Sequence, residues 1–322
     1  MTGERTAGMI KTPVCDLFGI EYPIFQGGMA WIADARLAAA VSNGGGLGII
    51  SAMNAGPDYL REQIRAAREM TDKPFGVNIM LMSPFAGEVA AVCAEEKVAV
   101  VTTGAGNPSK YMPIWLEAGI KVVPVIASVA MAKMVARAGA AAVVAEGTES
   151  GGHIGETTTL VLVPQVADAV DIPVIAAGGI GDGRGVAACF MLGAQGVQLG
   201  TRFLVAAECP VHENYKKKIL AANDIATIAT GRRLGHPVRS LKTSFSRRYA
   251  KAEYSGMPDE ELEQLAVGAL KKAALEGDEE NGCFLAGQVA GMIRREQPAA
   301  DIIREIFEEA EQVLKGAGRW VG

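Results

Sequence analysis

The stretch PVIAAGGIGDGRGVAACFMLGAQGVQLGTRF (residues 173–203) contains the pattern that decides the fold. An apolar run at 173–179 is followed by a helical pattern at 183–193 and by a second apolar run at 196–203. Continuous apolar runs are typical of strands buried in a parallel sheet, and an intervening helix lets the second strand return parallel to the first. The stretch therefore predicts a βα unit of an α/β fold.

The same pattern recurs upstream. Apolar runs that predict strands occur at residues 22–28, 47–51, 75–81, 98–104, 121–127, 141–147, 173–179 and 196–203. Helical patterns occur at 58–70, 87–96, 130–139 and 183–193. Eight βα units in about 200 residues predict a (β/α)8 TIM barrel over residues 1–206. An open doubly wound sheet is the alternative that periodicity alone leaves open.

The pattern changes after Phe203. Residues 207–283 contain charged helical segments, a basic loop and no convincing strand, which predicts a mostly helical insertion or cap after the eighth strand. Residues 284–322 then return to the barrel through a small apolar run at 284–293 and an amphipathic helix at 298–316.

Composition excludes several classes of protein. The net charge of −5 argues against a general nucleic-acid binder. The five cysteines are scattered without a CxxC pair, which favours reduced thiols over disulfides or a metal site. The N-terminus lacks the apolar core of a signal peptide, and no apolar run reaches the ~18–20 residues that span a bilayer. We therefore expect a cytoplasmic protein with no membrane partner.

Glycines and polar residues collect where the predicted strands end. In a (β/α)8 barrel the active site lies at that rim, and the loops after strands seven and eight frequently bind phosphate. Gly178 and Gly179 follow the seventh strand, and Gly200 and Thr201 follow the eighth. Their backbone N–H groups can approach an anion without obstruction by side chains. The alternative is that these are turn glycines only.

The remaining strand ends indicate what carries the phosphate. Backbone-rich walls around Gly27, Gly28 and Asn78 suit a flat heterocycle that is hydrogen-bonded along its edge. A ring together with a phosphate points to flavin mononucleotide (FMN), whose chemistry belongs to the cofactor while the protein supplies position and electrostatics. A flavin-free phosphosugar isomerase or lyase barrel is the alternative.

Five motifs carry a family resemblance. They are FQGGMAW (25–31), GVNIML (76–81), AEGTESGGHIG (145–155), IPVIAAGGIGDG (172–183) and QLGTRF (198–203). Together they resemble the family of flavin-dependent nitronate monooxygenases and type II enoyl-acyl-carrier-protein reductases. The reductase branch, known as FabK, is the closer likeness, since the similarity continues through 212–220, 231–239 and 286–293. Glu146 and Ile154 stand where monooxygenases usually have glutamine and arginine, which also favours the reductases.

The resemblance implies a set of cofactor contacts. The residues implied to bind FMN are Gly27, Gly28, Met29, Asn78, Glu146 and Gly151, with the phosphate on Gly179, Gly200 and Thr201 beside Gln198.

The resemblance also implies a function. It is the reduction of the 2,3-double bond of enoyl-acyl-carrier-protein thioesters in fatty acid synthesis, with hydride passing from NADH or NADPH through FMN to the substrate. The acidic acyl carrier protein would be the partner. Some relatives respond to monovalent cations, but no motif here fixes such a site. A homodimer is expected because two-fold dimers are the commonest soluble oligomers.

Histidine is rare in this chain, with three in 322 residues. His153 is the catalytic candidate, for substrate polarisation or proton donation, because an ordinary pKa of ~6.5 allows proton exchange near neutral pH. The alternative is an imidazole that only caps its loop. His212 is expected to be structural. His236 either lines the entrance for the acyl chain or only supports that entrance, and the sequence leaves both roles open.

Two further questions stay open at the sequence level. The basic run at 232–248 either attracts the acidic carrier protein or is an ordinary solvated face. The alternative function is a nitronate monooxygenase, which oxidises alkyl nitronates with FMN and O2, and a non-catalytic flavin-binding protein is a third.

Overall fold

The computed structural model describes residues 10–52 and 55–321. Residues 1–9, on which the expectation of no signal peptide largely rests, lie outside the described residues. The eight predicted strands all form. They are β1 (Ile24–Gln26), β2 (Gly48–Ser51), β3 (Phe75–Met80), β4 (Val100–Gly104), β5 (Lys121–Ile126), β6 (Val143–Glu146), β8 (Val174–Ala177) and β9 (Gly196–Leu199).

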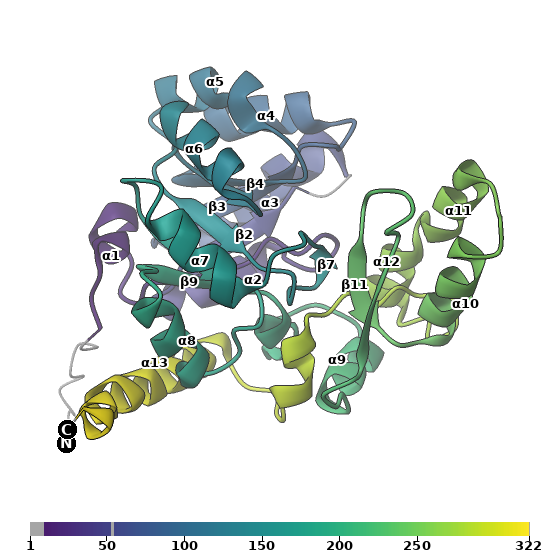
Figure 1. The fold of residues 1–322 in the computed structure, drawn as a ribbon. Coiled ribbons are helices and arrows are strands. Elements are labelled where there is room, and N and C mark those ends of the chain that lie inside the picture. The colour runs from purple at the N-terminus through teal and green to yellow at the C-terminus, as the bar shows by residue number, and fades with distance from the viewer. Residues whose placement is uncertain (1–9, 53–54, 322) are drawn as a thin grey trace.

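These strands form a single parallel barrel (Figure 1). Its order is β1-β9-β8-β6-β5-β4-β3-β2, and a parallel bridge between Phe25 and Leu47 joins the two ends. The predicted TIM barrel is confirmed, and the doubly wound alternative is wrong because an open sheet has no such bridge.

Helices cover the outside of the barrel. They are α2 (Ala35–Asn43), α3 (Gly56–Met70), α4 (Ala86–Glu95), α5 (Met112–Glu117), α6 (Val129–Arg137), α7 (Thr159–Ala167) and α8 (Gly183–Met191), with α13 (Ala299–Gly316) packed on α8 and α2. The five helices predicted at 58–70, 87–96, 130–139, 183–193 and 298–316 are confirmed to within two residues.

The barrel interior is filled at its amino-terminal end. Phe25, Val123 and Ile175 point inward and are fully buried with the short helix α1 (Pro13–Phe18) against them. The ring of Phe18 lies 5.1 Å from that of Phe25, edge to face. Because α1 closes this end, the carboxyl ends of the strands are left to form the site.

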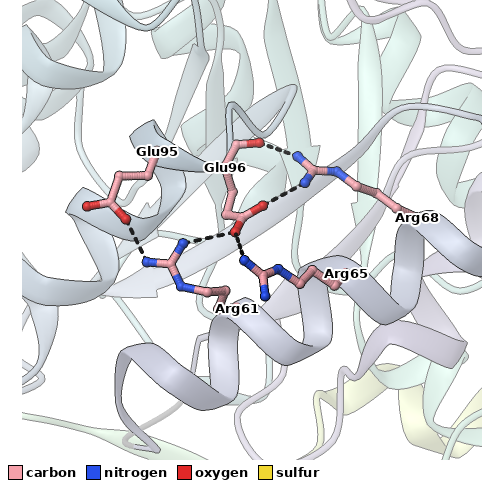
Figure 2. Close-up of polar contacts among 5 residues, drawn as sticks. All are labelled: Arg61, Arg65, Arg68, Glu95 and Glu96. Carbon is pink, nitrogen blue, oxygen red and sulfur yellow. Dashed lines mark hydrogen bonds and ion pairs between the residues drawn. The ribbon is translucent and has the colours of Figure 1, made fainter.

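An ion-pair cluster joins α3 to α4 (Figure 2). Glu96, just after α4, accepts from Arg61 at 2.9 Å, Arg65 at 3.3 Å and Arg68 at 2.6 Å, and Glu95 pairs with Arg61 at 2.6 Å. The side chain of Arg68 also donates to the backbone carbonyl of Glu96. The arginines thus satisfy the end of α4, where unpaired carbonyls carry partial negative charge.

The insertion stands beside the barrel as a separate lobe (Figure 1). Its elements are α9 (Glu213–Leu220), β10 (Thr227–Thr230), β11 (Val238–Leu241), α10 (Ser244–Glu253), α11 (Asp259–Ala266) and α12 (Ala269–Lys271). A small core of Phe245, Tyr249, Leu262 and Ala269 holds its helices together. The boundaries at 206 and 283 stay predictions.

The expectation that 207–283 holds no strand is wrong. β10 and β11 pair antiparallel, and β11 also pairs with β7 (Gly152–His153), a two-residue strand in the loop after β6. Neither β10 (TIAT) nor β11 (VRSL) is a continuous apolar run, and their pairing with each other and of β11 with a distant barrel loop stabilises them. No helix in residues 10–52 or 55–321 is long and apolar enough to cross a membrane.

Candidate active site

A cavity of about 430 Å³ opens at the carboxyl ends of the strands. All twelve residues predicted from the sequence line it, from the ends of β1, β3, β6, β8 and β9 and from the loop after β6 that contains β7. They are Gly27, Gly28, Met29, Asn78, Glu146, Gly151, His153, Gly178, Gly179, Gln198, Gly200 and Thr201. The structure brings them together, and their individual roles stay predictions.

The position of Asn78 at the cavity wall depends on a hydrogen bond from Thr102 and on the absence of a side chain at Gly28. Thr102 Oγ1 donates to Asn78 Oδ1 at 3.0 Å across β3 and β4. A Cβ on Gly28 would lie 2.2 Å from the Cβ of Asn78 and 2.8 Å from its amide nitrogen. Only glycine at position 28 therefore leaves the Asn78 amide in this position.

Glu146, the last residue of β6, is a half-buried carboxyl at the cavity. Ser150 Oγ donates to its Oε1 at 2.9 Å. Burial raises the pKa of Glu146 to about 7, and the Ser150 hydrogen bond opposes that rise only in part. The carboxyl therefore exchanges its proton near neutral pH.

His153 lies on β7, and its side chain reaches the open part of the cavity. Although it is exposed there, the surrounding protein lowers the pKa of His153 below its ordinary value, and repulsion from His236 lowers it further. The imidazole is therefore mostly neutral at pH 7.

The other two histidines have different surroundings. His212 Nδ1 accepts from the N–H of Asn214 at 3.1 Å and caps α9, which confirms its structural role. His236 is exposed in the loop between β10 and β11, close enough to His153 to affect its protonation.

The predicted phosphate corner combines the ends of β8 and β9. Gly178 and Gly179 have φ of 95° and 71°, the left-handed region that favours glycine. The hydroxyl oxygen of Thr201 accepts from the N–H of Gly287 at 2.9 Å, so its own proton can be donated into the cavity. Gln198 is buried beside Gly27.

Gly151 is required to be glycine by protein packing, whereas the sequence suggested close approach to a ligand. A Cβ there would lie 2.6 Å from the carbonyl carbon of Ala286 and 2.7 Å from the nitrogen of Gly287. The backbone of the returning segment, rather than the space for a ligand, already excludes a side chain at this position.

Sequence reasoning missed the part of the wall that the insertion and the returning segment supply. Leu270, Leu285, Gly287 and Val289 line the cavity. The 286–293 motif marked two of them, but only as a family likeness, because nothing in its spacing placed it at the rim. Trp31 also lines the cavity and was not predicted. Its backbone has a φ of 63°, and the Nζ of Lys271 in α12 lies 5.1 Å from the centre of its ring.

The basic run divides into separate environments. Arg239 is buried, and Arg232 and Arg233 pair with Glu156 and Asp259 at 3.2 and 2.9 Å. The exposed basic side chains that remain lie just before and along α10: Lys242, Arg247, Arg248 and Lys251. The last three, at i, i+1 and i+4, share the outer face of the helix, while Phe245 and Tyr249 face its core.

Comparison with known proteins gives the family. The family model described as nitronate monooxygenase matches residues 11–96 and 83–309. FabK from Thermotoga maritima is 52% identical, with a TM-score of 0.95 over 97% of this chain and 100% of that chain. A nitroalkane oxidase from Streptomyces ansochromogenes is 30% identical, with a TM-score of 0.83 over 94% of this chain and 99% of that one.

A curated relative acts on a coenzyme A thioester, by its name. It is the (3aS,4S,5R,7aS)-5-hydroxy-7a-methyl-1-oxo-octahydro-1H-indene-4-carboxyl-CoA dehydrogenase of Mycobacterium tuberculosis, 34% identical over 97% of this chain and 99% of its own length. The chain therefore belongs to the nitronate monooxygenase family of oxidoreductases, and within it is similar to FabK along nearly its whole length.

Proposed function

We propose that this protein is a cytoplasmic, FMN-dependent enoyl-acyl-carrier-protein reductase that uses NADH or NADPH in fatty acid synthesis. The observation that carries the proposal is the 52% identity and TM-score of 0.95 to FabK, against 30% identity to the nitroalkane oxidase. The dehydrogenase relative, at 34% identity, supports a thioester as the kind of substrate.

The cavity suits FMN. Gly27 and Gly28 present backbone to a flat ring, with the amide of Asn78 beside them. Thr201 begins a 3-10 helix, so its N–H has no partner within that helix, and it joins the hydroxyl and the glycines of the β8 loop as donors for a phosphate. When bound, FMN would supply hydride transfer between the nicotinamide and the substrate.

His153 would act on the thioester oxygen. Negative charge develops on that oxygen during reduction, and a positioned donor stabilises it. A neutral imidazole keeps one N–H to donate, and its position at the open part of the cavity suits a substrate that enters from outside. Glu146, with a pKa of about 7, can offer the cofactor edge either a donor or an acceptor at neutral pH.

The carrier partner would approach the insertion. Acyl carrier protein is strongly acidic, and the exposed face of α10 carries Arg247, Arg248 and Lys251 without an acidic residue among them. Complementary charge of this kind mainly raises the rate of association and the specificity.

An anaerobic assay tests the proposal. The protein with FMN is mixed with NADH or NADPH and a crotonyl thioester, and both nicotinamide oxidation and the saturated product are followed. We expect stoichiometric reduction without O2. An unreduced thioester, together with O2 uptake driven by an alkyl nitronate, would contradict the proposal.

The second candidate is that nitronate monooxygenase activity, which the family model and the nitroalkane oxidase favour. In the monooxygenase reaction the neutral His153 would accept a proton from the substrate.

The variant His153→Ala separates catalysis from cofactor binding. We expect it to retain FMN, while its turnover falls by at least about a hundredfold. Full turnover in this variant would remove the catalytic assignment, and purified protein that binds no FMN would favour a flavin-free barrel.

A further inference from the structure

The loop between β6 and β7 is bonded both to the barrel, where the Glu149 carboxylate accepts from Thr159, and to segments outside the barrel. It brings Ser150, Gly151 and His153 to the cavity. The N–H of Gln288 donates to the carbonyl of Glu149 at 2.9 Å, and the N–H of Ile154 donates to the carbonyl of Pro237 at 3.0 Å. The insertion and the returning segment therefore shape the loop that carries the catalytic candidate.

Arg239 makes the side-chain part of this connection. It lies on β11 opposite Gly152, and its side chain crosses to the loop. Nε and Nη2 donate to the carbonyl of Thr148 at 3.2 and 3.1 Å, and Nη1 donates to Thr227 Oγ1 on β10 at 3.3 Å. One guanidinium thus joins the loop to both strands of the hairpin.

The burial of this arginine is unusual. Arg239 is 8% exposed, and its direct partners are a carbonyl and a hydroxyl. Burial and the neighbouring Arg232 lower its pKa, while Glu149 opposes the shift. Burying a charge costs free energy unless hydrogen bonds compensate. An apolar residue would fill a hairpin core at lower cost, so the position of the donors points to the loop.

We propose that Arg239 is a positioning residue, which fixes the loop through Thr148 so that His153 and Ser150 hold their places at the cavity. Its importance for catalysis rests on the proposed function, whereas the fixing of the loop does not. Lysine cannot replace it, because a single ammonium lacks the planar set of donors that reaches Thr148 and Thr227 together.

Hydrogen–deuterium exchange and histidine NMR test the proposal on the FMN-bound protein. The variants are Arg239→Gln and Arg239→Lys, and the control is Lys242→Gln, an exposed basic residue directly after β11. We expect exchange in residues 147–156 to rise at least about tenfold in both Arg239 variants and to stay unchanged in the control.

The NMR titration of the His153 ring is a second measurement of whether the loop keeps its position. With three histidines in the chain, their ring protons can be assigned by substitution. Loss of the fixed, partly desolvated position should raise the pKa of His153 towards its ordinary value in Arg239→Gln. We also expect turnover of a small crotonyl thioester to fall by at least about tenfold, with a smaller change in KM.

Several results would overturn the proposal. One is unchanged exchange in 147–156 and an unchanged His153 titration in folded Arg239→Gln. Another is an equal rise of exchange across β10 and β11, which would assign Arg239 to hairpin stability alone. If Arg239→Gln does not fold, Arg239→Lys decides by the same criteria. Since exchange and titration need no substrate, they are independent of whether the thioester is reduced.

Discussion

Replacing Glu146 with glutamine should change how the stability of the protein depends on pH. Burial raises the pKa of Glu146 from 4.5 to about 7. The folded protein therefore binds more protons at this site than the unfolded chain between these two values. The stabilisation from the protonated carboxyl is complete below about pH 4.5 and is lost as the pH rises through about 7. Glutamine has nearly the same shape and no charge to desolvate.

The size of the effect follows from the shift in pKa. At 1.36 kcal/mol per unit, a carboxyl whose pKa rises from 4.5 to about 7 loses up to about 3.4 kcal/mol at high pH. Between about pH 5 and about pH 8 the wild type should lose about 2.5 kcal/mol relative to Glu146→Gln.

Urea unfolding of the cofactor-free protein at several pH values measures this difference. Glu156→Gln, an exposed carboxylate at the end of the same loop, controls for the change in net charge. The reasoning is refuted if the free energy of unfolding of wild type minus Glu146→Gln stays constant between about pH 5 and about pH 8. It is also refuted if the control shows the same trend.

Two further predictions concern packing and the ion-pair cluster. Glu96→Gln should lower the free energy of unfolding by about 1–2 kcal/mol, because it leaves three arginines without their shared carboxylate. Glu95→Gln, 58% exposed and paired with one arginine, should cost less than about 0.5 kcal/mol, and equal losses would contradict the argument. Gly28→Ala should weaken FMN binding at least about tenfold in a flavin absorbance titration, because the new methyl displaces Asn78. The control Gly87→Ala, whose Cβ would approach no atom outside its helix closer than 3.7 Å, should bind FMN as the wild type does.

Much of the site could be predicted from the sequence because barrel architecture converts position along the chain into position in space. Gly27 and Gly200 lie far apart in the sequence, yet each follows an apolar run, and parallel strands in a closed barrel bring their carboxyl ends to one rim. The buried strands also show as uninterrupted apolar runs, which local pattern alone reveals.

Other features depend on contacts that no local pattern contains. β7 and β11 contain polar residues rather than a continuous apolar run, and the two-residue β7 forms only by pairing with β11. Arg239 resembled its neighbours in a basic run, but tertiary structure buries it against Thr148 and leaves Arg247 in solvent.

The sequence by itself determined the barrel, the rim where the site lies and the residues that gather there. Only the tertiary structure decided the chemical state of those residues. Desolvation sets the pKa of Glu146 and His153, and it depends on which distant segments cover each group. Likewise, Gly151 must be glycine because the backbone at Ala286 packs against it, a contact made only when the chain returns from the insertion.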